Sequence, residues 1–290
     1  STLAQIGVFF LGLIPALLGL AICIVPLQVG ASTIAFPRAA AASFWGWLAG
    51  SGVLVGSYVA NGGPVGGTDD AVTLFLLAWA MVLGSLALAA VCVITTVITG
   101  RTNGMSLLRV PVFAWSMLVA ATVWLFNCAA LLANLLIVYV DTAHGQVLYG
   151  MAENRWAQLS WIVGQPAVLG FAVPVLGVVM DATVVSARVR PARYGVTLGA
   201  VGAAAALTFG AWAQTAFNPD LVRQPLFVLQ SLALLLPLLA FLGGVADTLK
   251  RGRPRPTSAM VVGIAGLLLL LGGAAASAAY AIEPLNLSFT

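Results

Sequence analysis

Long apolar stretches alternate with short polar breaks along almost the whole chain. A bilayer core of about 30 Å needs roughly 20 residues of helix, and eight stretches meet that length. The breaks hold clusters of Gly, Pro and Asn, such as Asn61-Gly62-Gly63-Pro64 and Arg253-Pro254-Arg255-Pro256. The pattern predicts an all-α bundle of eight transmembrane helices in a single domain, residues 1–290, with spans over 4–27, 43–59, 71–98, 112–140, 159–179, 196–213, 226–246 and 258–281.

The composition supports the same interpretation. Hydrophobic residues make up 61% of the chain, charged residues only 7%, and the mean hydropathy is +1.07. In soluble domains about a quarter of the residues are charged. Apolar surface that stays in contact with water raises the free energy by about 25 cal/mol per Å². Lipid must therefore be the solvent for most of the surface, and a water-soluble domain of useful size is excluded.

Positive charge is distributed unevenly between the breaks. The breaks after the first, third, fifth and seventh spans hold ten of the twelve Lys and Arg residues, whereas six of the eight acids lie in the other breaks and ends. Because cytoplasmic loops retain Lys and Arg, we expect both termini on the outer, periplasmic side of a bacterial cytoplasmic membrane. This asymmetry also explains the isoelectric point of about 9.3 without a nucleic-acid partner.

An outward N-terminus beginning at Ser1 is unusual for a chain without a signal peptide. Two explanations stay open at this point. Either a leading segment has been removed, or a helix is missing relative to an ancestral fold.

Four short blocks of sequence occur along the chain in an order that is typical of one known family. The first is Pro-Leu-Gln-Val-Gly-Ala at 26–31 followed by Phe-Pro-Arg at 36–38. The later blocks are Gly-Met-Ser at 104–106 with Trp115, then Trp161 with Gly164 and Pro166, then Trp212-Ala213 with Phe217 and Pro237. Together they resemble subunit I of the heme-copper oxidases, the family of cytochrome c oxidase. The resemblance implies a bundle like helices two to nine of that subunit, without its first and last three helices, and partners among other membrane subunits of a hetero-oligomeric respiratory complex.

The positions that bind metal in that family lack histidine here. The resemblance places the heme and copper ligands at Ala4 (Gln5 if the register slips), Gln165, Gln214 and Thr215. Amide and hydroxyl groups bind copper far more weakly than imidazole does, and none of these residues replaces an imidazole on heme iron. Ala167 stands for the proton-relay glutamate and Leu169 for the tyrosine. The resemblance therefore implies no heme, no copper and no catalytic residue.

Residues that take up protons in the family are replaced as well. Thr33 stands where one uptake path begins with aspartate, and Phe241 stands for the lysine of the other path. The single histidine of the chain, His144, falls in a break. Three single cysteines, Cys23, Cys92 and Cys128, lack metal-ligand spacing and are interpreted as small buried hydrophobes.

Polar residues within the spans are the remaining candidates for a site. Asp181 and Asp247 fall near Arg188 and Lys250 at the cytoplasmic ends of spans, which favours interfacial ion pairing. Asn127 and Asn134 share one face of a helix, and Gln165 and Gln214 replace ligands of one copper. We expect a cavity lined by Asn127, Asn134, Gln165, Leu169 and Gln214. Either the amides fill it by pairing, or it receives a quinone tail, a lipid or another small ligand.

Three hypotheses of function follow. The leading one is a non-catalytic membrane subunit that scaffolds or anchors a larger respiratory or redox complex. In this hypothesis the subunit holds no cofactor, except that it can bind a quinone or a lipid. The second is a subunit of a working oxidase or quinol-linked oxidoreductase that takes part in electron transport. The third is a transporter or a metal or heme assembly factor, although the chain has no Met-rich or His-rich tract.

Overall fold

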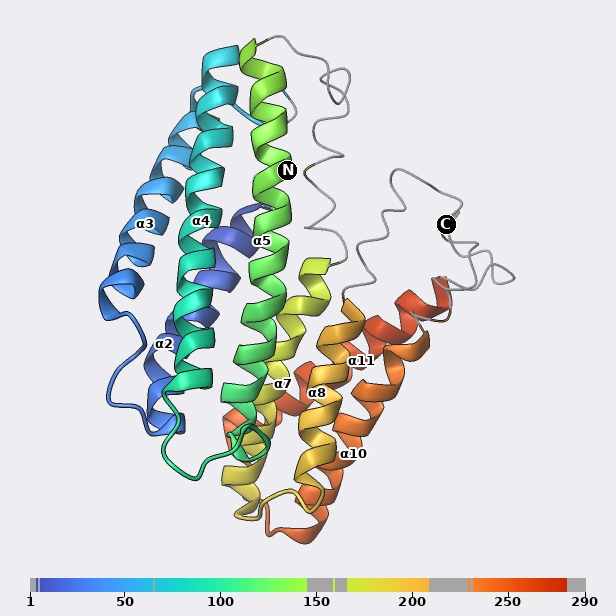
Figure 1. The fold of residues 1–290 in the computed structure, drawn as a ribbon. Coiled ribbons are helices and arrows are strands. Elements are labelled where there is room, and N and C mark those ends of the chain that lie inside the picture. Colours follow the sequence, from blue (N-terminus) through green and yellow to red (C-terminus); the bar gives the residue numbers. More distant parts are fainter. Residues whose placement is uncertain are drawn as a thin grey trace. The chain divides into compact units, whose positions relative to one another are not determined.

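The computed structural model describes residues 4, 6–64, 66–144, 159, 166–208, 229 and 232–280, and every regular element in these ranges is a helix (Figure 1). The all-helical prediction is confirmed for this part of the chain. The elements, in order, are the π-helix η1 (Gly7–Leu13), α2 (Ile14–Val29), α3 (Pro37–Val59), α4 (Asp69–Thr99), the short 3-10 helix η2 (Leu107–Arg109), α5 (Val112–His144), α7 (Pro166–Ala187), α8 (Tyr194–Thr208), α10 (Leu235–Arg251) and α11 (Ser258–Tyr280).

The helices occur where the apolar stretches predicted them, but several are longer. Pro37 begins α3 six residues before the expected start, because proline is favoured in the first turn, where its missing N–H would have no partner. Five helical segments among the described residues are long and apolar enough to cross a membrane, namely Gly7–Val29, Pro37–Val59, Asp69–Thr99, Val112–His144 and Ser258–Ala276. The chain is therefore an integral membrane protein.

The chain forms two compact units. The first comprises Ser1–Asn103 with Ala121–Val168, and the second comprises Gly104–Ala120 with Leu169–Thr290. In the first unit α2 and α3 both pack against α4. Trp79 of α4 is fully buried and meets the rings of Phe10 and Phe75 edge-on, with ring centroids 5.9 and 6.0 Å apart. The core of this unit thus lies along α4.

Small residues allow α3 to approach α4 closely. A Cβ added at Gly46 would overlap the Ser85 hydroxyl, and one at Gly50 would lie 3.0 Å from a methyl of Val82. Gly46 and Gly50 are four residues apart and so lie on one face of α3. This is the Gly-x-x-x-Gly arrangement by which membrane helices bring their backbones together.

Within the second unit, helices and loops are connected by hydrogen bonds to backbone carbonyls. The Trp115 indole donates to the carbonyl of Leu198 at 3.0 Å, connecting the start of α5 to α8. At one end of the unit the backbone N–H groups of Arg253 and Arg255 donate to the carbonyls of Ala187 and Ser186 at 3.3 and 3.2 Å. The arginine-containing loops after α7 and α10 therefore lie at the same end of this unit, as alternating spans require.

Candidate functional site

The predicted metal positions are only partly described by the structure. Ala4 is exposed, while Gln165, Gln214 and Thr215 lie outside the described residues. Leu169 lies in the first turn of α7, and its side chain is also outside the described part. The proximity of Gln165 to Gln214 and the cavity that they would line stay predictions.

Asn127 and Asn134 can be placed. Both lie on α5 in the first unit, seven residues apart on one face. The Asn127 side chain is buried, with 4% of its surface exposed, and its Oδ1 atom has no hydrogen-bond partner among the described residues. Asn134 is half-buried and has a polar partner. Of the two amides, Asn127 is the buried one, and its Oδ1 accepts no hydrogen bond from a described donor.

The donor set does not fit heme or copper. Heme iron and copper in such sites are held by imidazole nitrogens, and the whole chain contains one histidine. That residue, His144, is exposed at the last position of α5. Within the described residues no group of three His, Cys, Asp or Glu side chains comes together.

The position of the lost lysine is now part of the core. Phe241 of α10 is fully buried, so an aromatic ring occupies the place that the resemblance assigns to a proton-carrying side chain. A phenyl ring has no titratable group.

A polar pocket of about 700 Å³ lies beside the loop between α2 and α3, where Thr33 stands. Its lining comes from two segments that are distant in sequence, residues 30–37 and residues 96–103. The two loops lie at the same end of the first unit, below α2 and α4 (Figure 1). Hydroxyl and amide side chains dominate its polar lining: Ser32, Thr33, Thr96, Thr99, Thr102 and Asn103.

Backbone hydrogen bonds hold this pocket in shape. The N–H of Thr102 donates to the carbonyl of Val29 at 3.1 Å, and the N–H of Ala35 donates to the Thr96 hydroxyl at 2.8 Å. Gly30 ends α2 in the left-handed conformation with φ of +74°, where a side chain would meet Thr102. The close approach of the two loops therefore depends on glycine at this position.

Arg101 supplies the charge of the pocket. It is the one charged residue among the described residues of the lining, and its Nη1 donates to the Val97 carbonyl at 2.7 Å. Phe36 lines the same pocket with a φ of +55°, which is a strained conformation for a residue with a side chain, and 59% of its surface is exposed. The motif at Thr33 indicated only the loss of an acid. The polar run Thr-Gly-Arg-Thr-Asn at 99–103 is the sequence signal for this pocket, and it was not recognised as one.

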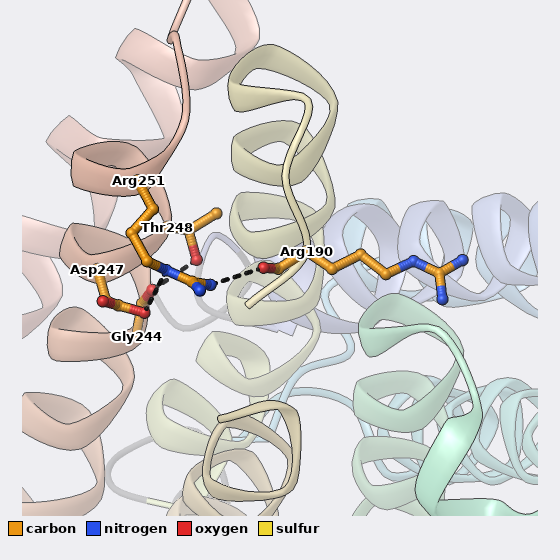
Figure 2. Close-up of polar contacts among 5 residues, drawn as sticks. All are labelled: Arg190, Gly244, Asp247, Thr248 and Arg251. Atoms are coloured by element: carbon orange, nitrogen blue, oxygen red, sulfur yellow. Dashed lines mark hydrogen bonds and ion pairs between the residues drawn. The ribbon is translucent and has the colours of Figure 1, made fainter. Parts of the chain in front are cut away.

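Asp247 takes part in an ion pair at the end of α10 (Figure 2). Its Oδ2 lies 3.2 Å from Nε of Arg251, one turn later on the same helix. Arg251 also donates to the backbone carbonyl of Arg190 at 3.0 Å, while the Arg190 side chain extends away from the pair. The predicted ion pairing of Asp247 is confirmed, with Arg251 rather than Lys250 as the partner. Asp181 lies within α7 and is half-buried with a partner of its own.

Comparison with known proteins gives a consistent result. A family model described as "Cytochrome C and Quinol oxidase polypeptide I" matches residues 4–290. A probable cytochrome c oxidase subunit 1-beta of Nocardia farcinica is 27% identical over 94% of this chain and 49% of its own length. A putative cytochrome c oxidase subunit 1-beta of Streptomyces coelicolor is 29% identical over 95% of this chain and 51% of its own length.

A relative with a different printed activity also matches. The quinol oxidase subunit 1 of Bacillus subtilis is 27% identical over 75% of this chain and 36% of its own length. The chain thus spans about half, or less, of the length of these relatives.

Proposed function

Because the chain belongs to the family of cytochrome c and quinol oxidase polypeptide I, we propose that it is a membrane subunit of a larger respiratory complex that contributes structure rather than chemistry. It packs against other membrane subunits and holds neither heme nor copper. The observation that carries the proposal is the donor set. A bundle of this family that offers one exposed histidine in the whole chain cannot ligate heme iron and copper as imidazole sites do.

The retained elements support a structural role. The Phe36-Pro37-Arg38 turn is kept, and the two polar loops at its end of the bundle are hydrogen-bonded together. The Gly46 and Gly50 contact keeps α3 against α4. A bundle that lacks reactive groups but keeps its helix packing can still bind other membrane subunits through the outer faces of its helices.

Purification of the full chain from native membranes in a mild detergent tests this proposal. We expect other membrane subunits to co-purify in a fixed ratio, and we expect no Soret absorption that follows this chain once it is separated from them. A matched control is a catalytic subunit I of the same family carried through the same separation, which should keep its Soret band. A chain that purifies alone, or one that retains heme at a stoichiometric level, contradicts the proposal.

A second function is favoured by the names of the relatives. Proteins named cytochrome c oxidase and quinol oxidase subunit 1 align with most of this chain. In this alternative the chain works in electron transport within an oxidase, with a heme or quinone bound by residues outside the family pattern. The buried Asn127 amide is its best candidate for a quinone contact. Extraction of the purified chain and assay for bound quinone, before and after Asn127→Leu, distinguishes the two functions.

The orientation of the bundle is a further part of the proposal. We place the arginine-bearing loops after α2, α4, α7 and α10 in the cytoplasm of a bacterial cell, and both termini in the periplasm, because positive loops are retained on the cytoplasmic side.

A further inference from the structure

An apolar groove lies along the same helices as the polar pocket beside Arg101, further from the end of the bundle. This groove has a volume of about 400 Å³ and is lined by η1 and α2, by α3, and by α4. Its walls are α2 and α3, which both pack on α4, and its floor consists of Ser85, Leu86 and Ala89. The lining is almost wholly apolar, with Pro15, Gly19 and Phe44 among its residues.

The two cavities lie at successive levels along the same helices. On α3 the polar pocket reaches Pro37, and the apolar groove begins at Ala40, three residues or about 4.5 Å further along the helix. On α4 the corresponding residues are Thr96 and Ala89, seven residues or about 10.5 Å apart. On α2 the pocket reaches Gly30 and the groove reaches Ile22, eight residues or about 12 Å apart. A charged, hydroxyl-lined pocket thus lies at the end of the bundle, and a separate apolar groove lies further along the span.

We propose that this surface binds one anionic phospholipid, with its phosphate in the pocket at Arg101 and an acyl chain in the groove beside Gly19. The charge of the pocket selects the headgroup. Arg101 is its one charged residue among those described, so it attracts an anion, and hydroxyl and amide groups of Thr99, Thr102 and Asn103 surround the same space. Basic pockets between membrane helices at the end with excess positive charge are sites for anionic lipid headgroups.

The apolar groove accounts for the acyl chain of the proposed phospholipid. An apolar channel within a membrane span is surrounded by acyl chains, and a chain that enters it fills space that helix packing leaves open. Apart from its chain neighbours and the backbone of its own helix, Gly19 has no heavy atom within 4 Å of the position of a Cβ, so α2 is open to an occupant there. A free phosphate ion would use the pocket alone, whereas a phospholipid uses both levels. This proposal is independent of which complex the chain joins.

Lipid retention in the full, purified chain tests the proposal. The probes are phosphatidylglycerol and phosphatidylethanolamine, added in equal amounts to the delipidated protein and measured by native mass spectrometry. We expect one phosphatidylglycerol to be retained, and a single Arg or Lys contact to favour it roughly fivefold over the zwitterionic lipid. Inorganic phosphate is the third probe, and it should neither bind comparably nor displace the lipid.

Two sets of variants distinguish the headgroup contact from the acyl-chain contact. Arg101→Gln should abolish the preference for phosphatidylglycerol, Arg101→Lys should keep most of it, and Arg253→Gln is the matched control for a lost exposed arginine elsewhere in the chain. Gly19→Leu should reduce retention of both lipids because leucine fills the groove. Its matched control is Gly52→Leu, on an exposed position of α3 that also has open space at its Cβ and does not line the groove.

Three outcomes overturn the proposal. One is that the wild-type chain retains no phospholipid under these conditions. Another is that Arg101→Gln and Gly19→Leu retain the lipids as their controls do. The last is that inorganic phosphate displaces the lipid, which would make the pocket a site for a free anion.

Discussion

The indole N–H of Trp47 donates a 3.2 Å hydrogen bond to the backbone carbonyl of Phe10, and so connects α3 to the π-helical start of the first span. The local hydrogen-bond pattern explains why that carbonyl is available. Ile14, whose N–H would serve Phe10 in an α-helix, donates instead to Phe9, and the next residue is Pro15, which has no N–H. Trp47 therefore donates to the Phe10 carbonyl, which receives no hydrogen bond from the helix that contains Phe10.

Replacing Trp47 with phenylalanine removes this donor and keeps most of the ring. An unsatisfied buried carbonyl costs about 1–3 kcal/mol, so we expect Trp47→Phe to lower the free energy of unfolding by that amount in a denaturant titration of the detergent-solubilised chain. Pro15→Ala supplies a new N–H one turn from Phe10, and the double variant should recover part of the loss. Losses that simply add in the double variant would show that the carbonyl has no role in the effect of Trp47.

A second prediction concerns the turn that shapes the polar pocket. Gly30 has a φ of +74°, and a Cβ there would overlap the side chain of Thr102. The left-handed conformation costs a residue with a side chain about 1–2 kcal/mol, so Gly30→Ala should destabilise the chain by at least this amount. Gly84→Ala, within α4 and with open space at its Cβ, is the control and should be neutral or stabilising. Equal melting temperatures for the two variants would contradict this role of Gly30.

A third prediction concerns the contact between α5 and α7 in the second unit. A Cβ on Gly177 would lie 2.7 Å from Cα of Phe113 and would overlap the side chain of Ser116. The backbone of Phe113 cannot move aside cheaply, so Gly177→Ala should cost about 1–3 kcal/mol through overpacking. Gly199→Ala on α8 has nothing within 4 Å and serves as the matched control. The melting temperature of both variants in detergent measures the difference, and an unchanged value for Gly177→Ala would show that the helices separate readily.

Much of the fold could be predicted because lipid imposes a simple condition on the sequence. A span needs a long apolar stretch whose backbone groups bond within the helix, and such stretches are visible in hydropathy alone. Boundaries were harder to predict. Pro37 begins α3 ahead of its most apolar part, and Asp247 lies inside α10 because its charge is balanced by Arg251 one turn later.

The candidate site was less visible in the sequence. The loss of the acid at Thr33 could be inferred from a motif, since it concerns one position in a local run. The contribution of Arg101 depends on two loops that meet in space through the Thr102 and Ala35 hydrogen bonds, and no local pattern reports that contact. Likewise, Pro15 is visible in the sequence, but the sequence does not show that the Ile14 N–H donates to the Phe9 carbonyl instead of the Phe10 carbonyl. That hydrogen bond is a property of the folded helix.

The two ends of α4 allow a direct test of orientation. Thr68 precedes α4 and Asn103 follows it, and both are exposed. Because Arg101 and Arg109 lie on the Asn103 side, we expect that side in the cytoplasm. Cys23 is exposed, so the prediction that it is buried was wrong, and it is replaced by alanine in the background for this test. In that background a membrane-impermeant maleimide should label Thr68→Cys in cells whose cytoplasmic membrane is intact. It should label Asn103→Cys only after that membrane is opened, since Cys92 and Cys128 are buried and should react little in either state. Labelling of Asn103→Cys in intact cells would invert the proposed topology, and with it the placement of the Arg101 pocket on the cytoplasmic face.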